Sequence, residues 1–405
     1  MGGQSGKNDK KQILMSYFVK SLLFFFTNLF RERKYDIVFY YPCHFNRGDD
    51  SQNIYFKHFF HICDQKGIKY IVFEEPDLSK NHPRNSDAVP FDFPLLTILL
   101  LRKLINIEKF ESFEHREWFI AKILKPLFFR KFTFNNYIVL SNSMMGFFRG
   151  LEKEARLFDY QHGVITSSHR GYVSENHEAA NHLKLNDANV LVYGKGFAQV
   201  LRNAVTDSYF DSHVFAIGNN LQGKFKNHSG KRNILFSLQF ADPNPVLNQE
   251  QMRIILNFFE TNPNFFISNG INILMKHHPR FQNDIDVSPL EKFEFTSFFY
   301  GTLFEGLNES FLHITLHSTT TFEAASVGVP TLLLKNSLLN PDFFIKDYNY
   351  PLGTLDGEQI VEKIGAYLRN KTLYQQDAKH LFEWYKNFYS SFNDDMFLGL
   401  LKGTK

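Results

Sequence analysis

Two segments in the second half of the chain combine residue types that suit phosphate binding. In the first, residues 316–330 (LHSTTTFEAASVGVP), hydroxyl residues follow an apolar run and open a helical pattern that a Gly-Val-Pro turn closes. Hydroxyls and free backbone N–H groups at the start of a helix bind anions. We therefore expect Ser318, Thr319 and Thr320 to hold a phosphate, and Glu323 to accept hydrogen bonds from ribose hydroxyls. The alternative is a purely structural capping box between Thr320 and Glu323.

The second segment places two histidines and a proline directly after a predicted strand. Residues 272–276 (NILMK) form the strand, and His277, His278 and Pro279 follow it. A histidine in this position can donate to a phosphate or nucleotide oxygen, and the proline fixes the turn. About 40 residues lie between this turn and Ser318, enough for a βα unit and a strand. We therefore expect both segments at one edge of one sheet.

The first half offers candidates for a general base. His162 follows the predicted strand 155–160, and an imidazole titrates close to physiological pH, as a base requires. Gly163 would let the backbone turn sharply and leave room for a sugar. Asp49 and Asp50, in a polar loop after the first predicted strand, are alternative bases. A structural histidine and a solvated loop are the other interpretations of these positions.

Composition argues against a metal protein and against a nucleic-acid-binding protein. The chain has 2 cysteines and no CxxC pair, and its adjacent aspartates do not form a DxD arrangement, so we predict no metal site and no required cofactor. The net charge of +3 is small for 405 residues, whereas nucleic-acid-binding proteins concentrate positive charge on one face. Hydrophobic residues at 43% exclude a disordered chain.

The strands that must position these residues alternate with helix-length segments, which is typical of parallel βαβ units. Strands are predicted at 36–41, 70–73, 136–140, 155–160, 189–193, 213–217, 233–238, 272–276, 312–316 and 331–334. A stretch rich in Gly, Asn and Lys at 218–230 separates the two groups. We predict an α/β protein with two Rossmann-like domains, 35–225 and 226–405, facing a cleft. In such sheets ligands bind beyond the carboxyl ends of the strands.

Residues 1–34 have the pattern of a membrane-surface segment. Residues 1–12 are polar and are expected to be disordered. Residues 13–30 form an apolar helical pattern with its polar residues in one arc and basic residues on both sides, which favours a helix lying in an anionic membrane interface. A buried core helix and a signal or spanning segment are the alternatives. Residues 95–132 are also apolar, aromatic and basic, and they either contact the bilayer or pack on the first sheet.

The pairing of Lys-x-His-Pro at 276–279 with Ser-Thr-Thr-x-x-Glu-Ala-x-x-x-Gly-x-Pro at 318–330 resembles the donor domain of bacterial GT-B transferases of capsule and teichoic-acid synthesis. These include the CDP-glycerol glycerophosphotransferases and the sialyl- and polysialyltransferases. The strong part of the resemblance covers about 60 residues. It implies that the phosphate and ribose of a cytidine nucleotide are held by His278, Pro279, Ser318, Thr319 and Thr320, with Glu323 and the additional His277 beside them.

The turn after strand 155–160 is similar to the strand-then-His-Gly turn of the glycerophosphotransferases. The resemblance implies that His162 deprotonates the acceptor hydroxyl. Those enzymes carry Trp-His-Gly-Thr-Pro, whereas here Gln161 precedes the histidine and Val164-Ile165 follow Gly163.

Together these features predict a metal-independent, inverting glycosyltransferase with an N-terminal acceptor domain and a C-terminal nucleotide-donor domain. The donor is expected to be a CMP- or CDP-linked sugar, with uridine and guanosine donors as alternatives. The acceptor is a hydroxyl of a cell-surface polysaccharide or of a lipid-linked glycan. We expect a cytoplasmic protein bound peripherally to the inner face of the cell membrane, with no nucleic-acid partner. The alternatives are a non-hydrolysing nucleotide-sugar 2-epimerase and a catalytically inactive scaffold for capsule assembly.

Overall fold

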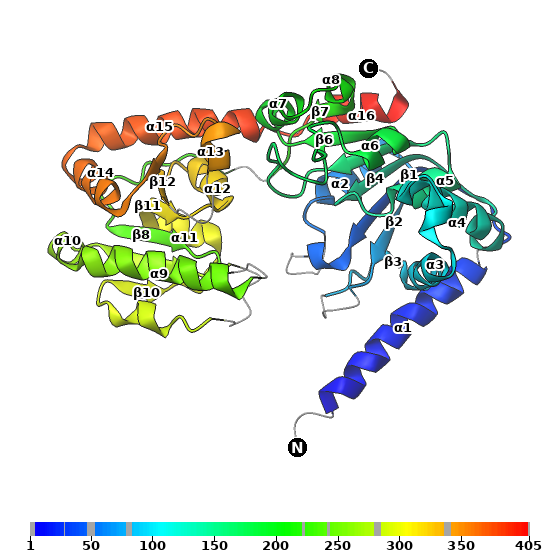
Figure 1. Cartoon of the computed structure of the whole chain (residues 1–405), viewed down its shortest axis with the longest axis horizontal. Helices are drawn as coiled ribbons and strands as arrows, with labels where there is room; N and C mark the ends of the chain where they lie inside the picture. The colour runs from blue at the N-terminus through cyan, green and yellow to red at the C-terminus, as the bar shows by residue number, and fades with distance from the viewer. Residues whose placement is uncertain are drawn as a thin grey trace. The chain divides into compact units, whose positions relative to one another are not determined.

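The computed structural model describes residues 5–27, 29–46, 53–77, 83–220, 223–240, 244–278, 285–335 and 342–403, with the side chains of the first helix described from Met15. The chain divides into two compact units. Unit 1 comprises residues 1–193, 201–217 and 392–405, and unit 2 comprises residues 194–200 and 218–391. Each unit contains one parallel sheet (Figure 1).

Unit 1 is built on a seven-stranded sheet with the order β3-β2-β1-β4-β5-β6-β7. Its strands are buried apolar runs, as a parallel sheet covered on both faces requires. The strands are β1 (Arg33–Pro42), β2 (Tyr70–Glu75), β3 (Val89–Pro90), β4 (Phe132–Leu140), β5 (Arg156–Tyr160), β6 (Ala188–Val192) and β7 (Val214–Ala216). The helices are α1 (Ser5–Thr27), α2 (Lys57–Lys66), α3 (Asp92–Leu104), α4 (Phe113–Phe128), α5 (Met145–Leu151), α6 (Asn181–Asn186), α8 (Tyr209–His213) and α16 (Asp394–Lys402), while α7 (Lys195–Ala204) begins in unit 2.

Unit 2 contains a six-stranded sheet with the order β10-β9-β8-β11-β12-β13. Its strands are β8 (Asn233–Ser237), β9 (Asn272–Lys276), β10 (Thr296–Phe298), β11 (Ser310–Thr315), β12 (Thr331–Leu334) and β13 (Thr354–Leu355). Its helices are α9 (Pro245–Thr261), α10 (Pro263–Ser268), α11 (Leu303–Glu309), α12 (Thr320–Ser326), α13 (Asp342–Lys346), α14 (Gly357–Arg369) and α15 (Lys371–Phe388). The core lies between the sheet and these helices and is rich in phenylalanine.

Both sheets have the strand order of the Rossmann fold, 3-2-1-4-5-6, with one strand added in unit 1. The prediction of two Rossmann-like α/β units is therefore confirmed. In this order the chain reverses direction across the sheet between β1 and β4, and again between β8 and β11. Ligands of such sheets bind at the carboxyl ends of the strands beside this reversal, called the switch point. The residues that follow β1, β4, β8 and β11 are accordingly placed to contact a ligand.

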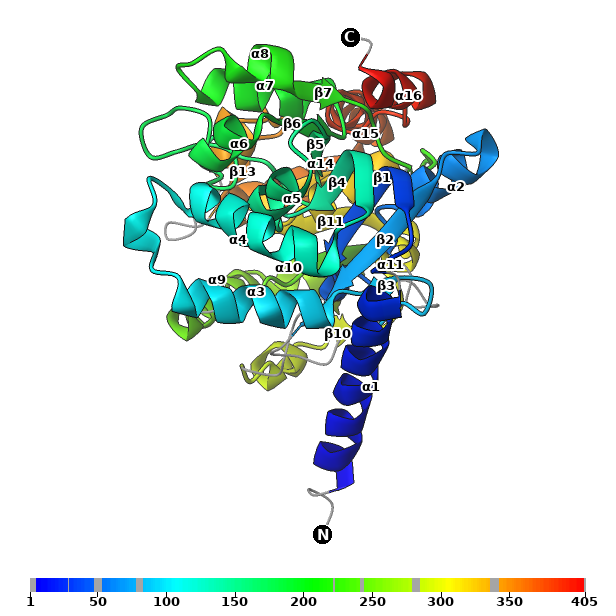
Figure 2. The ribbon, with the colours of Figure 1, turned by 90° about the vertical axis from the view of Figure 1, so that its right-hand side faces the viewer.

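Helix α1 begins at Ser5, so the predicted disorder does not extend over residues 5–12. The second half of α1 packs against α3 and β3 (Figure 2). In this part Phe25 is fully buried, and Ser21 accepts a hydrogen bond from the backbone N–H of Phe93 at 3.1 Å. The opposite face of α1 carries exposed apolar side chains, one per helical turn, at Met15, Val19, Leu23 and Phe26. No helix within the described ranges is both long enough and apolar enough to cross a bilayer.

The division of the chain differs at one end from the predicted domains. The break between the units falls at residues 217 and 218, close to the predicted boundary at 225. Residues 392–405, which the prediction assigned to the second domain, pack in unit 1. Their ring contacts show this, since Phe397 lies 4.9 Å from Phe59 between ring centroids.

Candidate active site

His162 lies directly beyond the carboxyl end of β5 in unit 1. Its Nε2 is 3.1 Å from the hydroxyl of Ser141, the first residue after β4. Its ring packs edge-on to Phe45, which follows β1, with 5.0 Å between centroids. The side chain is half-buried. Residues after three neighbouring strands therefore surround this imidazole, beside the switch point of the first sheet.

Gln161 fixes the turn that carries His162. Its side chain is fully buried, accepts a hydrogen bond from the Tyr193 N–H at 2.8 Å, and donates one to the Gly163 carbonyl at 2.8 Å. The glutamine thus ties the ends of β5 and β6 together around the histidine. Gly163 does not have the left-handed conformation that a sharp turn would need, and no atom lies within 4 Å of a Cβ built there. The chain bends at Gly163 without needing the conformation that only glycine adopts easily, and the expected open space beside it is present.

The turn after β4 has an unusual backbone. Ser141, Asn142 and Met144 all have positive φ angles, of 65°, 56° and 58°. Non-glycine residues rarely adopt this region, and such strain persists only where the surrounding structure holds it in place. The backbone N–H of Asn142 donates to Asp159 Oδ1 at 2.9 Å, and the Asn142 side chain donates to the Gly171 carbonyl at 3.1 Å.

Asp159 is the anchor of this turn, and sequence reasoning missed it. The carboxyl group is fully buried in β5 and also accepts a hydrogen bond from the Tyr172 hydroxyl at 2.6 Å. Burial raises the pKa of Asp159 to about 7, although its hydrogen bonds from Tyr172 and Asn142 act in the opposite direction. A charged residue inside the apolar run RLFDY was the available signal.

The alternative bases Asp49 and Asp50 lie outside the described residues, as does Pro279 in unit 2. Among the residues that are described, no group of three or more His, Cys, Asp or Glu side chains is placed to hold a metal ion.

In unit 2 the hydroxyl residues follow β11 at the switch point of the second sheet. Ser318 is buried, and its hydroxyl accepts a hydrogen bond from the Thr320 N–H at 3.2 Å. Thr319 and Thr320 are half-buried. Helix α12 begins at Thr320, and Thr319 at its N-cap position makes no side-chain capping bond. The capping-box alternative is therefore wrong, because Glu323 lies one position beyond the place that such a box requires.

A buried histidine within β11 contacts the residues that form this turn. His313, within β11, is fully buried, and its Nδ1 lies 2.9 Å from the Thr331 hydroxyl. Its Nε2 lies 2.8 Å from the Ser237 hydroxyl and 3.3 Å from the Thr320 hydroxyl. Burial lowers the pKa of His313 to about 3, so the ring stays neutral. One imidazole thus links β8, β11, β12 and the start of α12, and sequence reasoning did not single it out.

Glu323 carries the other perturbed carboxyl group. Its Oε2 is buried and has no hydrogen-bond partner among the described residues. Burial raises the pKa of Glu323 to about 7. A carboxyl group in this state can bind a hydroxyl donor, such as the ribose hydroxyl that we expected it to meet.

His277 and His278 follow β9, at the carboxyl edge of the same sheet as Ser318. The ring of His277 stacks on Phe298 with centroids 4.5 Å apart and planes 10° apart. Burial and, to a lesser degree, the charge of Lys276 lower the pKa of His277. Strand β8 lies between β9 and β11, so two strand spacings, about 10 Å, separate the two segments. The predicted juxtaposition of these segments at one sheet edge is present.

Solved structures share the fold of this chain at low sequence identity. A scan against protein-family models found no match, and a search among curated proteins found none by sequence. A Listeria monocytogenes protein proposed to be a UDP-N-acetylglucosamine 2-epimerase superposes with a TM-score of 0.53 at 12% identity, covering 91% of this chain and 96% of its own. The UDP-GlcNAc 2-epimerase of Neisseria meningitidis bound to UDP-GlcNAc gives 0.51 at 11%, covering 92% and 100%. The glycotransferase of kitacinnamycin gives 0.50 at 11%, covering 92% and 99%. The chain therefore has a GT-B-like fold.

Proposed function

We propose that this protein is a glycosyltransferase that moves a sugar from a nucleotide-activated donor to a hydroxyl of a cell-surface glycan or a lipid-linked glycan. The observation that carries the proposal is the arrangement in unit 2. His277 and His278 after β9, and Thr319 and Thr320 after β11, lie at one sheet edge on either side of β8. This edge is where Rossmann sheets bind nucleotides.

The donor side of the reaction follows from these groups. The hydroxyls of Thr319 and Thr320, at the start of α12, would bind the leaving phosphate. Glu323 would accept a hydrogen bond from ribose, and the histidines after β9 would contact phosphate or nucleotide oxygens. We propose that these fixed donors stabilise the charge of the leaving phosphate without a metal ion.

The acceptor side belongs to unit 1. His162 would take the proton from the acceptor hydroxyl as that oxygen attacks the anomeric carbon, and the nucleotide would leave from the opposite face. Such a direct displacement inverts the configuration at the anomeric carbon. Ser141, 3.1 Å from His162 Nε2, would orient the imidazole. Asp159, through the strained turn, would set the position of Ser141.

A membrane location at the inner face of the cell membrane agrees with the exposed surface of unit 1. Helix α3 exposes Leu96, Leu100 and Leu104, one residue per turn, and α1 exposes a similar stripe. Exposed apolar stripes of this kind mark interaction with a membrane or a partner. A lipid-linked acceptor would explain why a glycosyltransferase carries such a surface.

A nucleotide screen by thermal shift tests the donor site. We expect CMP or CDP to raise the unfolding temperature, since a ligand present at about 100 times its Kd stabilises the folded state by about 2.7 kcal/mol. UDP and GDP are the alternative donor classes. Thr319→Val should reduce the shift, because it removes a hydroxyl that makes no capping bond to α12 and would therefore be available to a phosphate. Thr372→Val, at an exposed threonine of α15, is the matched control.

The competing candidate is a nucleotide-sugar 2-epimerase, which the names of two of the superposed structures favour. Epimerisation of a nucleotide sugar without any acceptor would support it against the transferase. A scaffold without activity predicts that none of the nucleotides changes the unfolding temperature, and that result would end both enzyme proposals.

A further inference from the structure

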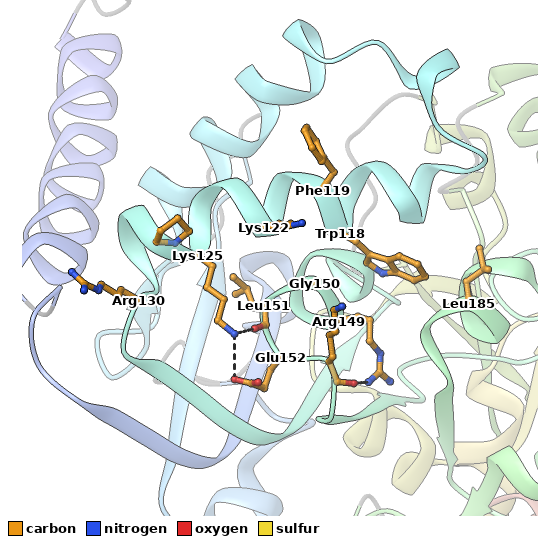
Figure 3. A pocket seen from close by; sticks show the side chains of 12 residues that line it. Trp118, Phe119, Lys122, Lys125, Arg130, Arg149, Gly150, Leu151, Glu152 and Leu185 are labelled. Atoms are coloured by element: carbon orange, nitrogen blue, oxygen red, sulfur yellow. Dashed lines mark hydrogen bonds and ion pairs between the residues drawn. The ribbon is translucent and has the colours of Figure 1, made fainter.

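A pocket of about 900 Å³ lies in unit 1, apart from the candidate active site (Figure 3). Its lining comes from α4, from the end of α5 with the segment after it, and from α6. Arg130 stands just before β4 and Lys153 just before β5. The pocket therefore lies toward the amino-terminal ends of these strands, at the opposite edge of the sheet from His162. None of the residues proposed to bind the nucleotide or the acceptor lines this pocket.

One wall of the pocket is apolar. Trp118, Phe119, Pro126, Leu151 and Leu185 contribute to it. The indole of Trp118 is held in place because its Nε1 donates to Asn186 Oδ1 at 3.0 Å. Phe119 is 43% exposed. This wall offers a fixed surface to a hydrocarbon group.

The rim of the pocket is positively charged. Lys122, Arg130 and Lys153 line it and are exposed, and no hydrogen bond or ion pair to another described residue engages their side chains. Of the described lining residues one is acidic, Glu152, and it lies 3.8 Å from Lys125 Nζ. Three cations are thus available to an anion from outside.

Exposed apolar side chains lie near the pocket, at the end of α4 and on α1. Leu127, next to Pro126 in α4, is 51% exposed, and Phe26 of α1 is 50% exposed. The two helices meet there, since the rings of Phe26 and Phe128 lie 5.8 Å apart between centroids. The end of α4 that lines the pocket therefore also carries an apolar surface exposed to solvent.

We propose that this pocket binds an anionic lipid of the bilayer, with the lipid phosphate at the cationic rim and part of its acyl chain on the Trp118–Phe119 wall. The two chemistries lie side by side, as phosphate and hydrocarbon do at a membrane interface. A soluble anion would leave the apolar wall unused, and an apolar protein partner would leave the cations unpaired. The site binds lipid as an anchor and is independent of the nucleotide site.

Tryptophan fluorescence and vesicle sedimentation test the proposal. The chain has 2 tryptophans, so Trp384→Phe leaves Trp118 as the single reporter in the pocket. We expect vesicles of phosphatidylcholine with phosphatidylglycerol to shift Trp118 emission to the blue and to sediment the full-length protein. Vesicles of phosphatidylcholine alone should do neither. Sedimentation of the unmodified chain gives the same answer if Trp384→Phe fails to fold.

Reversing the charge of two pocket residues distinguishes binding at the pocket from non-specific electrostatic attraction of the protein to the vesicles. Lys122→Glu with Arg130→Glu should weaken partitioning into the anionic vesicles by about 30-fold or more. The control, Lys292→Glu with Lys371→Glu, changes the net charge equally at exposed lysines of unit 2 and should have little effect. The nucleotide-dependent thermal shift should be unchanged in both, so the lipid site and the donor site can fail separately.

Three results would overturn the proposal. Partitioning that survives the Lys122/Arg130 reversal would exclude the pocket as the lipid site. An equal loss in the control pair would mean non-specific attraction. An equal fluorescence shift with inorganic phosphate alone would mean a site for a soluble anion.

Discussion

The imidazole of His162 depends on neighbours that the sequence does not place beside it. Gln161 holds its turn by two hydrogen bonds of 2.8 Å, and Ser141 approaches its Nε2 from the next strand. Asp159 then fixes the strained turn that carries Ser141. Ser141 contacts the imidazole directly, whereas Asp159 acts on it through the turn, so single substitutions at these positions should give effects of different size.

His162→Ala should lower the transfer rate by about 10²- to 10⁴-fold, because it removes the proposed general base. Ser141→Ala should cost less, since the imidazole remains and only its orientation loosens. The measurement is turnover with the donor that the nucleotide screen identifies, with circular dichroism to show that both variants fold. Full activity of His162→Ala would remove this residue from the mechanism and leave the fold assignment intact.

Because of the buried Asp159, we expect the unfolding free energy of unit 1 to fall as the pH rises. Its pKa is about 7 in the folded protein against 3.8 in an ordinary setting, because burial disfavours the charged carboxylate. The folded state therefore holds the proton more tightly than the unfolded state between these two values. The contribution to stability is complete below about pH 4, falls as the pH rises to 7, and amounts to roughly 4 kcal/mol at most.

Urea unfolding of the native protein and of Asp159→Asn across this pH range would measure that effect. The variant cannot ionise, so the difference in unfolding free energy between the two proteins should change steadily from pH 4 to pH 7 and then level off. A difference that stays constant with pH would show that the carboxyl group ionises normally in the folded protein.

At the scale of elements, two glycines let helices α4 and α5 approach closely. Gly146 and Gly150 lie four residues apart on α5. A Cβ built on Gly150 would lie 2.6 Å from Ala121 Cβ and 2.7 Å from Trp118 Cα. Neither neighbour can rotate away, because one contact is to a methyl group and the other is to backbone. Gly150 also lines the proposed lipid pocket, so the close packing of α4 and α5 forms part of its surface.

Gly150→Ala should therefore destabilise unit 1 by about 1–3 kcal/mol through overpacking. Gly163→Ala is the matched control, since its Cβ would meet no atom within 4 Å and its φ is not positive. Chemical denaturation with a probe for unit 1 measures both. Equal stability of the two variants would mean that the helices separate at no cost, against the packing described here.

At the scale of the whole molecule, the C-terminal segment that begins at Phe392 belongs to unit 1, which is otherwise formed by the first half of the chain. Phe397 in α16 is 1% exposed and packs on Phe59 of α2, with His58 and Asp394 3.0 Å apart beside them. The C-terminal segment is therefore part of the first core, although the whole of the second sheet intervenes in the sequence.

Phe397→Ala should lower the unfolding free energy of unit 1 by about 3–5 kcal/mol, the usual loss for a buried phenylalanine. Met396→Ala, at a neighbouring side chain that is 38% exposed, should change it by no more than about 0.5 kcal/mol. Denaturation followed by Trp118 fluorescence in the Trp384→Phe background would report on unit 1. A destabilisation confined to unit 2 would contradict the assignment of this segment.

The sequence alone determined the elements and the positions at their ends. Buried parallel strands are short apolar runs, and in surface helices apolar residues recur about every 3.6 positions. Apolar runs such as DIVFYY and NILMK therefore located most strands within a few residues. Strands β3 and β13, of two residues each, and β10, of three, were not predicted, because runs this short give little pattern. Residues after the strands, including His162 and Ser318, could be selected because parallel sheets bind ligands at that edge.

Only the tertiary structure decided which of those residues meet and what supports them. Asp159 reaches Asn142 and Tyr172, and His313 reaches Ser237 across 76 positions of sequence. Such contacts depend on strand order and register, which local periodicity does not specify. The exposed apolar face of α1 was likewise decided by packing, because a helical pattern shows that two faces differ but not which of them the rest of the protein covers.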